Sequence, residues 1–202
     1  MPERFSEDEF RNDFSRVAIK EIERIDVLVA RLRGLAMPSD QSLAPLDLRT
    51  PLEETLALLR GQLEQARISL NLEFAEDLPL VAGDFAQLKQ LFLNLLVNAV
   101  EAMDVGGSLS IRVRSHSMPE RRTVTVDVID SGVGIPEHLL SRVFEPFVTT
   151  KPHGSGLGLS ICRGITDAHR ATIRARNNSP SRGVTVTVAF PSSMNIATSM
   201  TR

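Results

Sequence analysis

The spacing of apolar residues predicts one long helix near the start of the chain. Between Glu7 and Ala36, apolar side chains recur three and four residues apart, with charged residues between them. Such a heptad-like seam suits packing on another helix, although an amphipathic helix folded onto its own domain shows the same pattern. Met37-Pro38 and Pro45 then interrupt the pattern, which favours a bundle or dimerisation helix over a core helix.

Strict alternation of apolar and polar residues predicts strands in the rest of the chain. The alternating runs are Ile68–Phe74, Leu109–Arg114, Thr123–Val128 and Val184–Phe190. Helices are expected from Pro51 to Ala66, from Asp84 to Met103 and up to His169. Because strands with one apolar face need one layer of helices, we expect an α+β fold: a two-layer α/β sandwich with a mixed, mostly antiparallel sheet.

Composition narrows the function classes. The chain has 202 residues, 42% of them hydrophobic, and a formal net charge of −2, which gives no electrostatic reason to expect nucleic acid. Cys162 is the only cysteine, so an internal disulfide is excluded. No run approaches the length of a membrane span and no signal peptide opens the chain. We therefore expect a cytoplasmic protein with no membrane contact from this chain.

A polar stripe runs along the predicted helix from Asp84 to Met103. At 3.6 residues per turn its members fall within roughly 80° of an otherwise apolar circumference. They are Gln87, Gln90, Asn94, Asn98 and Glu101. Such a stripe must face a cavity, water or a ligand, and carboxamide oxygens suit Mg²⁺. The same groups could instead cap neighbouring backbone or face solvent on a thin exposed edge.

Two glycine-containing segments follow. Asp130 ends a strand on its buried face, where a carboxylate needs strong hydrogen bonds, and an exocyclic amine such as that of adenine can donate one. Gly132 and Gly134 let the backbone approach a flat ring, although Asp-Ser-Gly is also an ordinary turn. The run from Gly154 to Gly158 opens a helix, where freed N–H groups bind phosphate, or forms a plain flexible loop.

In this order the segments resemble the ATP-binding domain of two-component sensor histidine kinases, in the Bergerat-type superfamily of gyrase, heat-shock chaperones and mismatch-repair ATPases. The matching runs are NLLVNAVEAM (N box), DSGVGIP (first glycine box), FEPFVTTK (F box) and GSGLGLSI (second glycine box). The resemblance covers residues 46–191. It implies a catalytic ATP-binding domain over residues 47–191, a partial dimerisation and phosphotransfer helix over 1–37, a linker over 38–46 and a tail over 192–202.

The resemblance also implies site residues, with ATP and Mg²⁺ as the bound groups. Asn98 would hold Mg²⁺ with Asn94 nearby, and Asp130 would receive the adenine amine. Phe144 to Lys151 would belong to a mobile lid. The nucleotide-binding set is Asn94, Asn98, Asp130, Gly132, Gly134, Thr150, Lys151, Gly154, Ser155, Gly156, Leu157 and Gly158.

Two positions bear on the reaction. Hydrolytic members of the superfamily carry a glutamate where this chain has Asn94, a poor general base, which favours a kinase over an ATPase. The accepting histidine of the kinases lies in a motif that none of the four histidines here matches. His116 is expected in a polar loop, His138 after the first glycine box, His153 in the lid, and His169 near a helix C-terminus, where a cation is favourable. All four are expected at the surface or in the lid.

The expected reaction is transfer of the γ-phosphoryl group of Mg-ATP to a histidine outside this chain. Expected partners are a histidine-bearing hairpin, a response regulator and a second copy joined through the N-terminal helix. An anti-sigma-factor-type serine kinase and a non-catalytic nucleotide-binding module are the alternatives. Asn94 and the N-terminal helix count against the first of these.

Overall fold

The structure, a computed structural model, describes residues 43–118, 121–151 and 154–193. The elements in chain order are β1 (Ala44–Leu46), α2 (Arg49–Gln65), β2 (Ser69–Phe74), β3 (Val81–Gly83), α3 (Phe85–Ala102), β4 (Ser108–Met118), β5 (Arg121–Asp130), α4 (Glu137–Leu140), α5 (Gly158–Ala168), β6 (Thr172–Asn177) and β7 (Val184–Pro191). The helix predicted from Glu7 to Ala36 lies outside the described residues, as does the predicted tail beyond Ser193. Within the described part of the chain, no helix is both long and apolar enough to cross a membrane.

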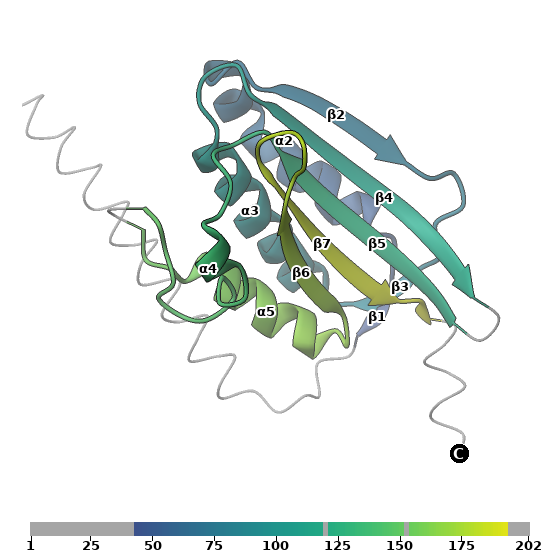
Figure 1. Ribbon diagram of the computed structural model, residues 1–202. Helices are drawn as coiled ribbons and strands as arrows, with labels where there is room; N and C mark the ends of the chain where they lie inside the picture. The colour runs from purple at the N-terminus through teal and green to yellow at the C-terminus, as the bar shows by residue number, and fades with distance from the viewer. Residues whose placement is uncertain (1–42, 119–120, 152–153, 194–202) are drawn as a thin grey trace, which may run out of the picture. The chain divides into compact units, whose positions relative to one another are not determined.

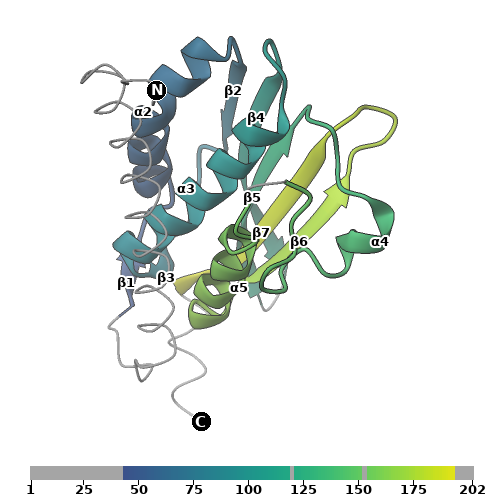
Figure 2. The ribbon, with the colours of Figure 1, turned by 90° about the vertical axis from the view of Figure 1, so that its left-hand side faces the viewer.

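The main sheet has five strands in the order β2-β4-β5-β7-β6 (Figure 1). β2 and β4 are parallel, and every other neighbouring pair is antiparallel. Helices α2, α3 and α5 cover one face of this sheet (Figure 2). This arrangement confirms the predicted two-layer α/β sandwich with a mixed, mostly antiparallel sheet.

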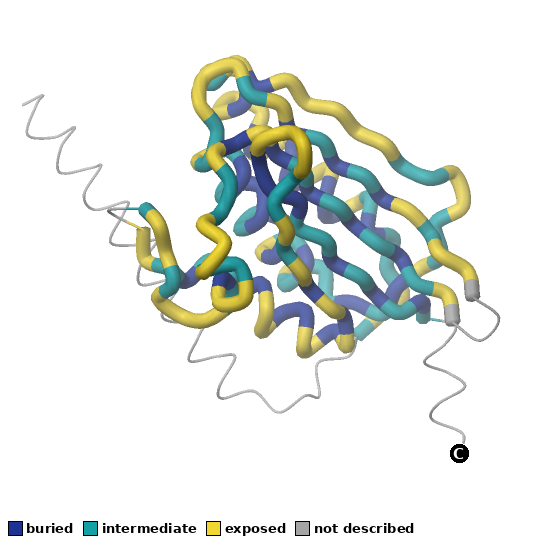
Figure 3. Tube along the Cα trace, viewed as in Figure 1, coloured by how far each residue is buried: buried dark blue, intermediate teal, exposed yellow. Residues whose placement is uncertain are grey.

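The alternation in the sequence explains which face is covered. From Val124 to Asp130, every second residue of β5 is buried, and the residues between them are more exposed (Figure 3). On the helix side, Leu91 and Phe92 of α3 are fully buried against this apolar face. Since α3 contacts both α2 and α5, it is the central helix of its layer.

The elements β3, α4 and β6 were not predicted, and in place of β1 the sequence predicts a short extended piece at Leu46–Leu48 that overlaps it only at Leu46. All four elements have a weak pattern. β1 and β3 have three residues each and pair with one another in a separate antiparallel sheet. α4 is a single turn, and the edge strand β6 carries apolar side chains only at Ile173 and Ala175. Segments this short or this polar do not establish a period.

The edge strand β2 differs from its expected half-buried character. Leu70 and Leu72 keep 40% and 42% of their surface exposed. β2 has a strand neighbour on one side only, β4, so its apolar residues are covered less completely than those of the central strands. The alternation predicted the strand correctly and overstated its burial.

His169 ties two helices together inside the core, so the expectation of a surface position was wrong. The side chain is 1% exposed. Its Nδ1–H donates to the carbonyl oxygen of Ile165 in α5 at 2.8 Å, and its Nε2 accepts from the backbone N–H of Asp84 at 3.0 Å. Asp84 is the N-cap of α3, where its side chain accepts from the Gln87 N–H at 2.9 Å. Burial lowers the pKa of His169, so the neutral ring joins the end of α5 to the start of α3.

This burial makes the stability of the fold depend on pH. Below about pH 6.5 the unfolded chain binds a proton at His169 that the folded chain disfavours, so the free energy of unfolding falls as the pH falls. We expect His169→Gln to flatten the decline of unfolding free energy between about pH 7 and pH 5. Urea unfolding across this range measures it. His138→Gln, at an exposed position on α4, is the control and keeps the original slope; an unchanged slope in His169→Gln would contradict the assignment.

Candidate nucleotide-binding site

The polar stripe of α3 faces the start of α5. The backbone carbonyl of Gly158 accepts from Asn94 Nδ2 at 3.4 Å, and Asn94 Oδ1 accepts from Gln90 Nε2 at 2.9 Å. Asn98, one turn further along, lies so close to Gly158 that a Cβ there would come within 3.3 Å of Asn98 Nδ2. Asn94 therefore makes the hydrogen bond to neighbouring backbone that was the alternative to a ligand contact. Asn98 instead lies beside a space that is open because residue 158 is a glycine.

The glycine-rich segment before α5 lies directly against the F box. The Gly156 carbonyl accepts from the Phe147 N–H at 3.0 Å, and Gly156 has φ +66°. A Cβ at Gly156 would collide with the Phe147 backbone, so this position requires glycine. Leu157 is the N-cap of α5, and its apolar side chain accepts no hydrogen bond from the first N–H groups of the helix. Aligned N–H groups at a helix N-terminus attract phosphate.

Lys151, just before the glycine-rich segment, contacts the polar side of α3. Its Nζ pairs with Glu101 Oε2 at 2.5 Å, and its carbonyl accepts from the Gly154 N–H at 3.1 Å. Ser155 Oγ accepts from the Leu157 N–H at 3.4 Å. The F box, the second glycine box and the N box thus meet along the polar side of α3.

Asp130 is buried, with 6% of its surface exposed, as the strand register predicted. Its Oδ1 accepts from the Gly132 N–H at 2.8 Å and the Val184 N–H at 3.1 Å. Both of these bonds use one oxygen, which leaves Oδ2 available to a ligand. Burial raises the pKa of Asp130, and the two backbone N–H donors oppose that rise.

The first glycine box is fixed to α3 and to the β6–β7 turn. The Val133 N–H donates to the carbonyl of Ala102, the last residue of α3, and a Cβ at Gly132 would collide with the same carbonyl. At Gly183, in the β6–β7 turn, φ is +103° and a Cβ would collide with the carbonyl oxygen of Asp130. Because Gly132 has no side chain, the glycine box that follows Asp130 can pack against the end of α3.

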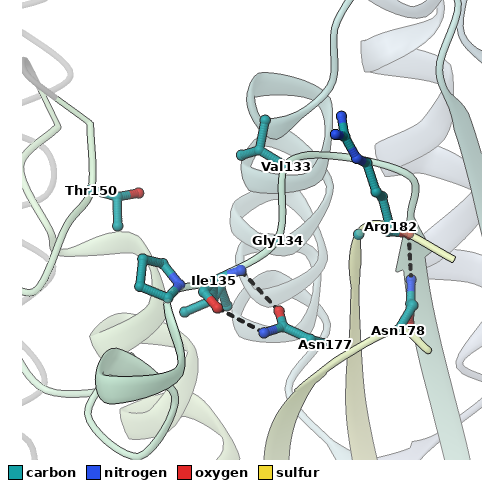
Figure 4. A pocket seen from close by; sticks show the side chains of 9 residues that line it. Val133, Gly134, Ile135, Thr150, Asn177, Asn178 and Arg182 are labelled. Atoms are coloured by element: carbon teal, nitrogen blue, oxygen red, sulfur yellow. Dashed lines mark hydrogen bonds between the residues drawn. The ribbon is translucent and has the colours of Figure 1, made fainter. Parts of the chain in front are cut away.

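A cavity of about 560 Å³ opens beside the first glycine box (Figure 4). It is lined by Val133, Gly134, Ile135, Pro136, Thr150, Asn177, Asn178, Arg182 and Gly183. Only Gly134 and Thr150 belong to the predicted set. The other predicted residues lie along α3 and α5 or at the end of β5, so the structure divides them between two neighbouring regions.

The sequence reasoning missed the contribution of the β6–β7 turn. Asn177, Asn178 and Gly183 all contact the first glycine box or Asp130. In the sequence Asn177 ends a weakly patterned strand and the other two follow it, so all three look like ordinary turn residues. The signal available in the sequence was a pair of asparagines, Asn177 and Asn178, followed by Pro180 and Gly183 in a short segment before the alternating strand.

The structure places three of the four histidines. His116, expected in a loop, is part of β4 and its Nε2 lies 3.1 Å from Thr125 Oγ1. The loop expectation failed because β4 continues beyond its apolar run. His138 is exposed on α4, His169 is buried, and His153 lies outside the described residues.

Fold and site together define a nucleotide-binding domain with an N box, two glycine boxes and an F box. Residues 83–194 match the family described as Histidine kinase-, DNA gyrase B-, and HSP90-like ATPase, and the chain belongs to this family. Within it, the chain resembles the catalytic domains of sensor histidine kinases.

Two curated relatives are similar over most of this chain. Sporulation kinase A of Bacillus subtilis (strain 168) is 35% identical over 176 residues, which cover 87% of this chain and 28% of that protein. Signal transduction histidine-protein kinase AtoS of Escherichia coli (strain K12) is 32% identical over 184 residues, or 91% of this chain and 30% of that protein. The chain thus spans less than a third of the length of these relatives.

Solved structures show the same fold. The nucleotide-free catalytic domain of histidine kinase ThkA is 34% identical, with a TM-score of 0.64 over 74% of this chain and 95% of that one. ThkA in complex with the response regulator protein TrrA is 29% identical, with a TM-score of 0.72 over 94% of this chain and 53% of that one. The described domain is therefore a histidine-kinase catalytic domain.

The close approach at Gly183 gives a stability prediction with a matched control. We expect Gly183→Ala to destabilise the domain by about 2 kcal/mol or more, because both the positive φ and the Asp130 carbonyl exclude a Cβ. Gly164→Ala, in α5 with no atom near the added Cβ, should stabilise it by about 0.5–1 kcal/mol. Urea unfolding of both variants tests this; equal effects would show that the Gly183 contact is unimportant.

Proposed function

We propose that this chain binds Mg-ATP and delivers the γ-phosphoryl group to a histidine on a helical hairpin. The observation that carries the proposal is that Asn98, Lys151 and the uncapped start of α5 meet along the polar side of α3. The last residue of the same helix, Ala102, accepts the Val133 N–H of the glycine box that begins at the buried Asp130. Phosphoryl transfer depends on positioning and charge neutralisation, which amides, a lysine and helix N–H groups supply.

The chemistry of Asn98 fits Mg²⁺. A neutral carboxamide oxygen is a suitable ligand for an ion that keeps several waters and binds phosphate oxygens. The absence of a Cβ at Gly158 leaves space beside this amide. Asn94 fits less well than predicted, because its oxygen already accepts a hydrogen bond from Gln90. Bound Mg²⁺ would neutralise charge on the phosphates.

The other residues take complementary roles in the proposal. Asp130 Oδ2 would accept from the exocyclic amine of adenine, while the N–H groups at the start of α5 and the ammonium of Lys151 would hold phosphate oxygens. Lys151 would then exchange its present partner, Glu101, for the more highly charged phosphates. The acceptor nitrogen would form its bond to phosphorus as the bond to the ADP oxygen breaks.

Asn94 supports transfer over hydrolysis. A carboxamide cannot take a proton from water, and both polar atoms of Asn94 already make hydrogen bonds to Gln90 and Gly158. The phosphoryl group is therefore kept for a protein acceptor. By analogy with the ThkA–TrrA complex, a response regulator is the proposed final acceptor.

Labelled ATP incubated with the protein and a separate histidine-bearing hairpin tests the proposal. Acid-labile label on the hairpin histidine is the expected result. Acid-stable label on a serine would indicate a serine kinase of the anti-sigma-factor type instead. Nucleotide binding without transfer would indicate a non-catalytic module.

Asn98→Ala tests the metal site. We expect transfer to fall by about a hundredfold or more, because the amide that would hold Mg²⁺ is removed. The fold should be retained, since Asn98 is only partly buried. Asn71→Ala, the same substitution on the distant edge strand β2, is the control. Unchanged transfer in Asn98→Ala would remove this residue from the metal site.

Asp130→Asn tests the base contact. We expect ADP to bind about tenfold more weakly, because a charged acceptor is replaced by a group that presents one acceptor and one donor. GDP, which has a carbonyl where adenine has its amine, should lose less. Calorimetry with both nucleotides measures the difference, and equal losses would argue against the adenine contact.

A further inference from the structure

We propose that Asn177 and Asn178, consecutive residues where β6 ends, are positioning residues that give the site its preference for adenine over other purines. The inference rests on the proposed function, because it concerns the shape of the same base-binding region. Neither side chain needs to touch the nucleotide. Both act through the first glycine box and Asp130.

Asn177 binds the backbone of Ile135 at two points (Figure 4). Its Oδ1 accepts from the Ile135 N–H at 2.8 Å, and its Nδ2 donates to the Ile135 carbonyl at 2.7 Å. A carboxamide presents a donor and an acceptor side by side, as a neighbouring strand does. Ile135 lies within the glycine box and belongs to no strand. Asn177 therefore gives its backbone the two hydrogen bonds that a neighbouring strand would give.

This two-point contact acts where the backbone has the most freedom. Gly134, directly before Ile135, has φ +83°, and a Cβ there would lie 3.3 Å from Asn177 Oδ1. A glycine alone populates several backbone conformations with similar energy. Fixing both polar groups of the next residue selects one of them.

Asn178 fixes the other end of the same segment. Its Nδ2 donates to the backbone carbonyl of Asp130 at 3.0 Å and lies 3.3 Å from that of Arg182. Its Oδ1 accepts from the Thr185 hydroxyl at 2.6 Å, so the amide cannot rotate without losing bonds on both sides. The β6–β7 turn thus holds the Asp130 backbone through Asn178 and the Asp130 carboxylate through the Val184 N–H.

The two asparagines therefore fix the distance and orientation between Asp130 and Ile135. One hydrogen bond to an amine distinguishes adenine from hypoxanthine only when the acceptor and the opposite wall are held in place. If the glycine box were free to move, the site could adapt to a base with a carbonyl in place of the amine. We therefore expect loss of the Asn177 contact to reduce selectivity as well as affinity.

Calorimetry with Mg²⁺ and two probes, ADP and inosine diphosphate, tests the inference. We expect Asn177→Ala to weaken ADP binding about tenfold and inosine diphosphate binding less than about threefold, so that the ratio of the two dissociation constants falls. The control is Asn71→Ala, which also removes a carboxamide that bonds to neighbouring side chains, at the far edge of the sheet. This control should keep both dissociation constants.

Hydrogen exchange separates positioning from a general structural role. In Asn177→Ala the Ile135 amide should exchange faster while the amides of β5 and β7 keep their protection. If Asn177→Ala does not fold, Asn177→Asp carries the test, because it keeps the acceptor for the Ile135 N–H and replaces the donor to the Ile135 carbonyl with a charged acceptor.

Each outcome is decisive. Equal loss of both nucleotides, or loss of protection throughout the sheet, would overturn the positioning role and leave the proposed function standing. Failure of the unmodified protein to bind ADP would overturn the proposed function, and with it this inference.

Discussion

The buried carboxylate of Asp130 is the interaction on which the arrangement of the site depends. It ends the central strand β5 at a point where a charge is costly, and two backbone N–H groups, from Gly132 and Val184, offset that cost. One donor belongs to the first glycine box and the other to β7. Because both bind the same oxygen, the glycine box and the β6–β7 turn are held on either side of the carboxylate. The remaining oxygen is left for a ligand.

Helix α3 connects this carboxylate to the proposed phosphate end of the site. Its apolar side is buried against the sheet, and its polar side carries Asn94, Asn98 and Glu101 toward α5 and Lys151. Its C-terminal carbonyl, at Ala102, receives the Val133 N–H of the glycine box. Its N-terminus is held by His169 from the end of α5. The helix is therefore fixed at both ends by segments that belong to the site.

Much of this was predictable because strong periodicity and side-chain chemistry are local properties. The alternating valines of β5 and β7 predicted the strands and placed Asp130 on the buried face, and the helical stripe predicted the accessible side of α3. The burial of His169 was not predictable in the same way. A histidine near a helix C-terminus suits a surface cation equally well. His169 is instead held in the core by the N–H of Asp84, which lies 85 positions away in the chain. The contacts of Asn177 with Ile135 span 42 positions and depend on a strand too polar to predict.

The two ends of the site depend on different kinds of support. At the proposed phosphate end, Asn98, Gly158 and Lys151 are held by α3 and α5, whose mutual position is set by buried apolar contacts and by His169. At the proposed base end, Asp130 and the glycine box are held by hydrogen bonds from a turn at the sheet edge, with little apolar burial around Asn178 and Arg182. Hydrophobic contacts tolerate small displacements, whereas hydrogen bonds weaken steeply with angle and distance. In the proposed function, recognition of the base needs the stricter geometry, and the hydrogen-bonded asparagines would supply it where the core does not reach.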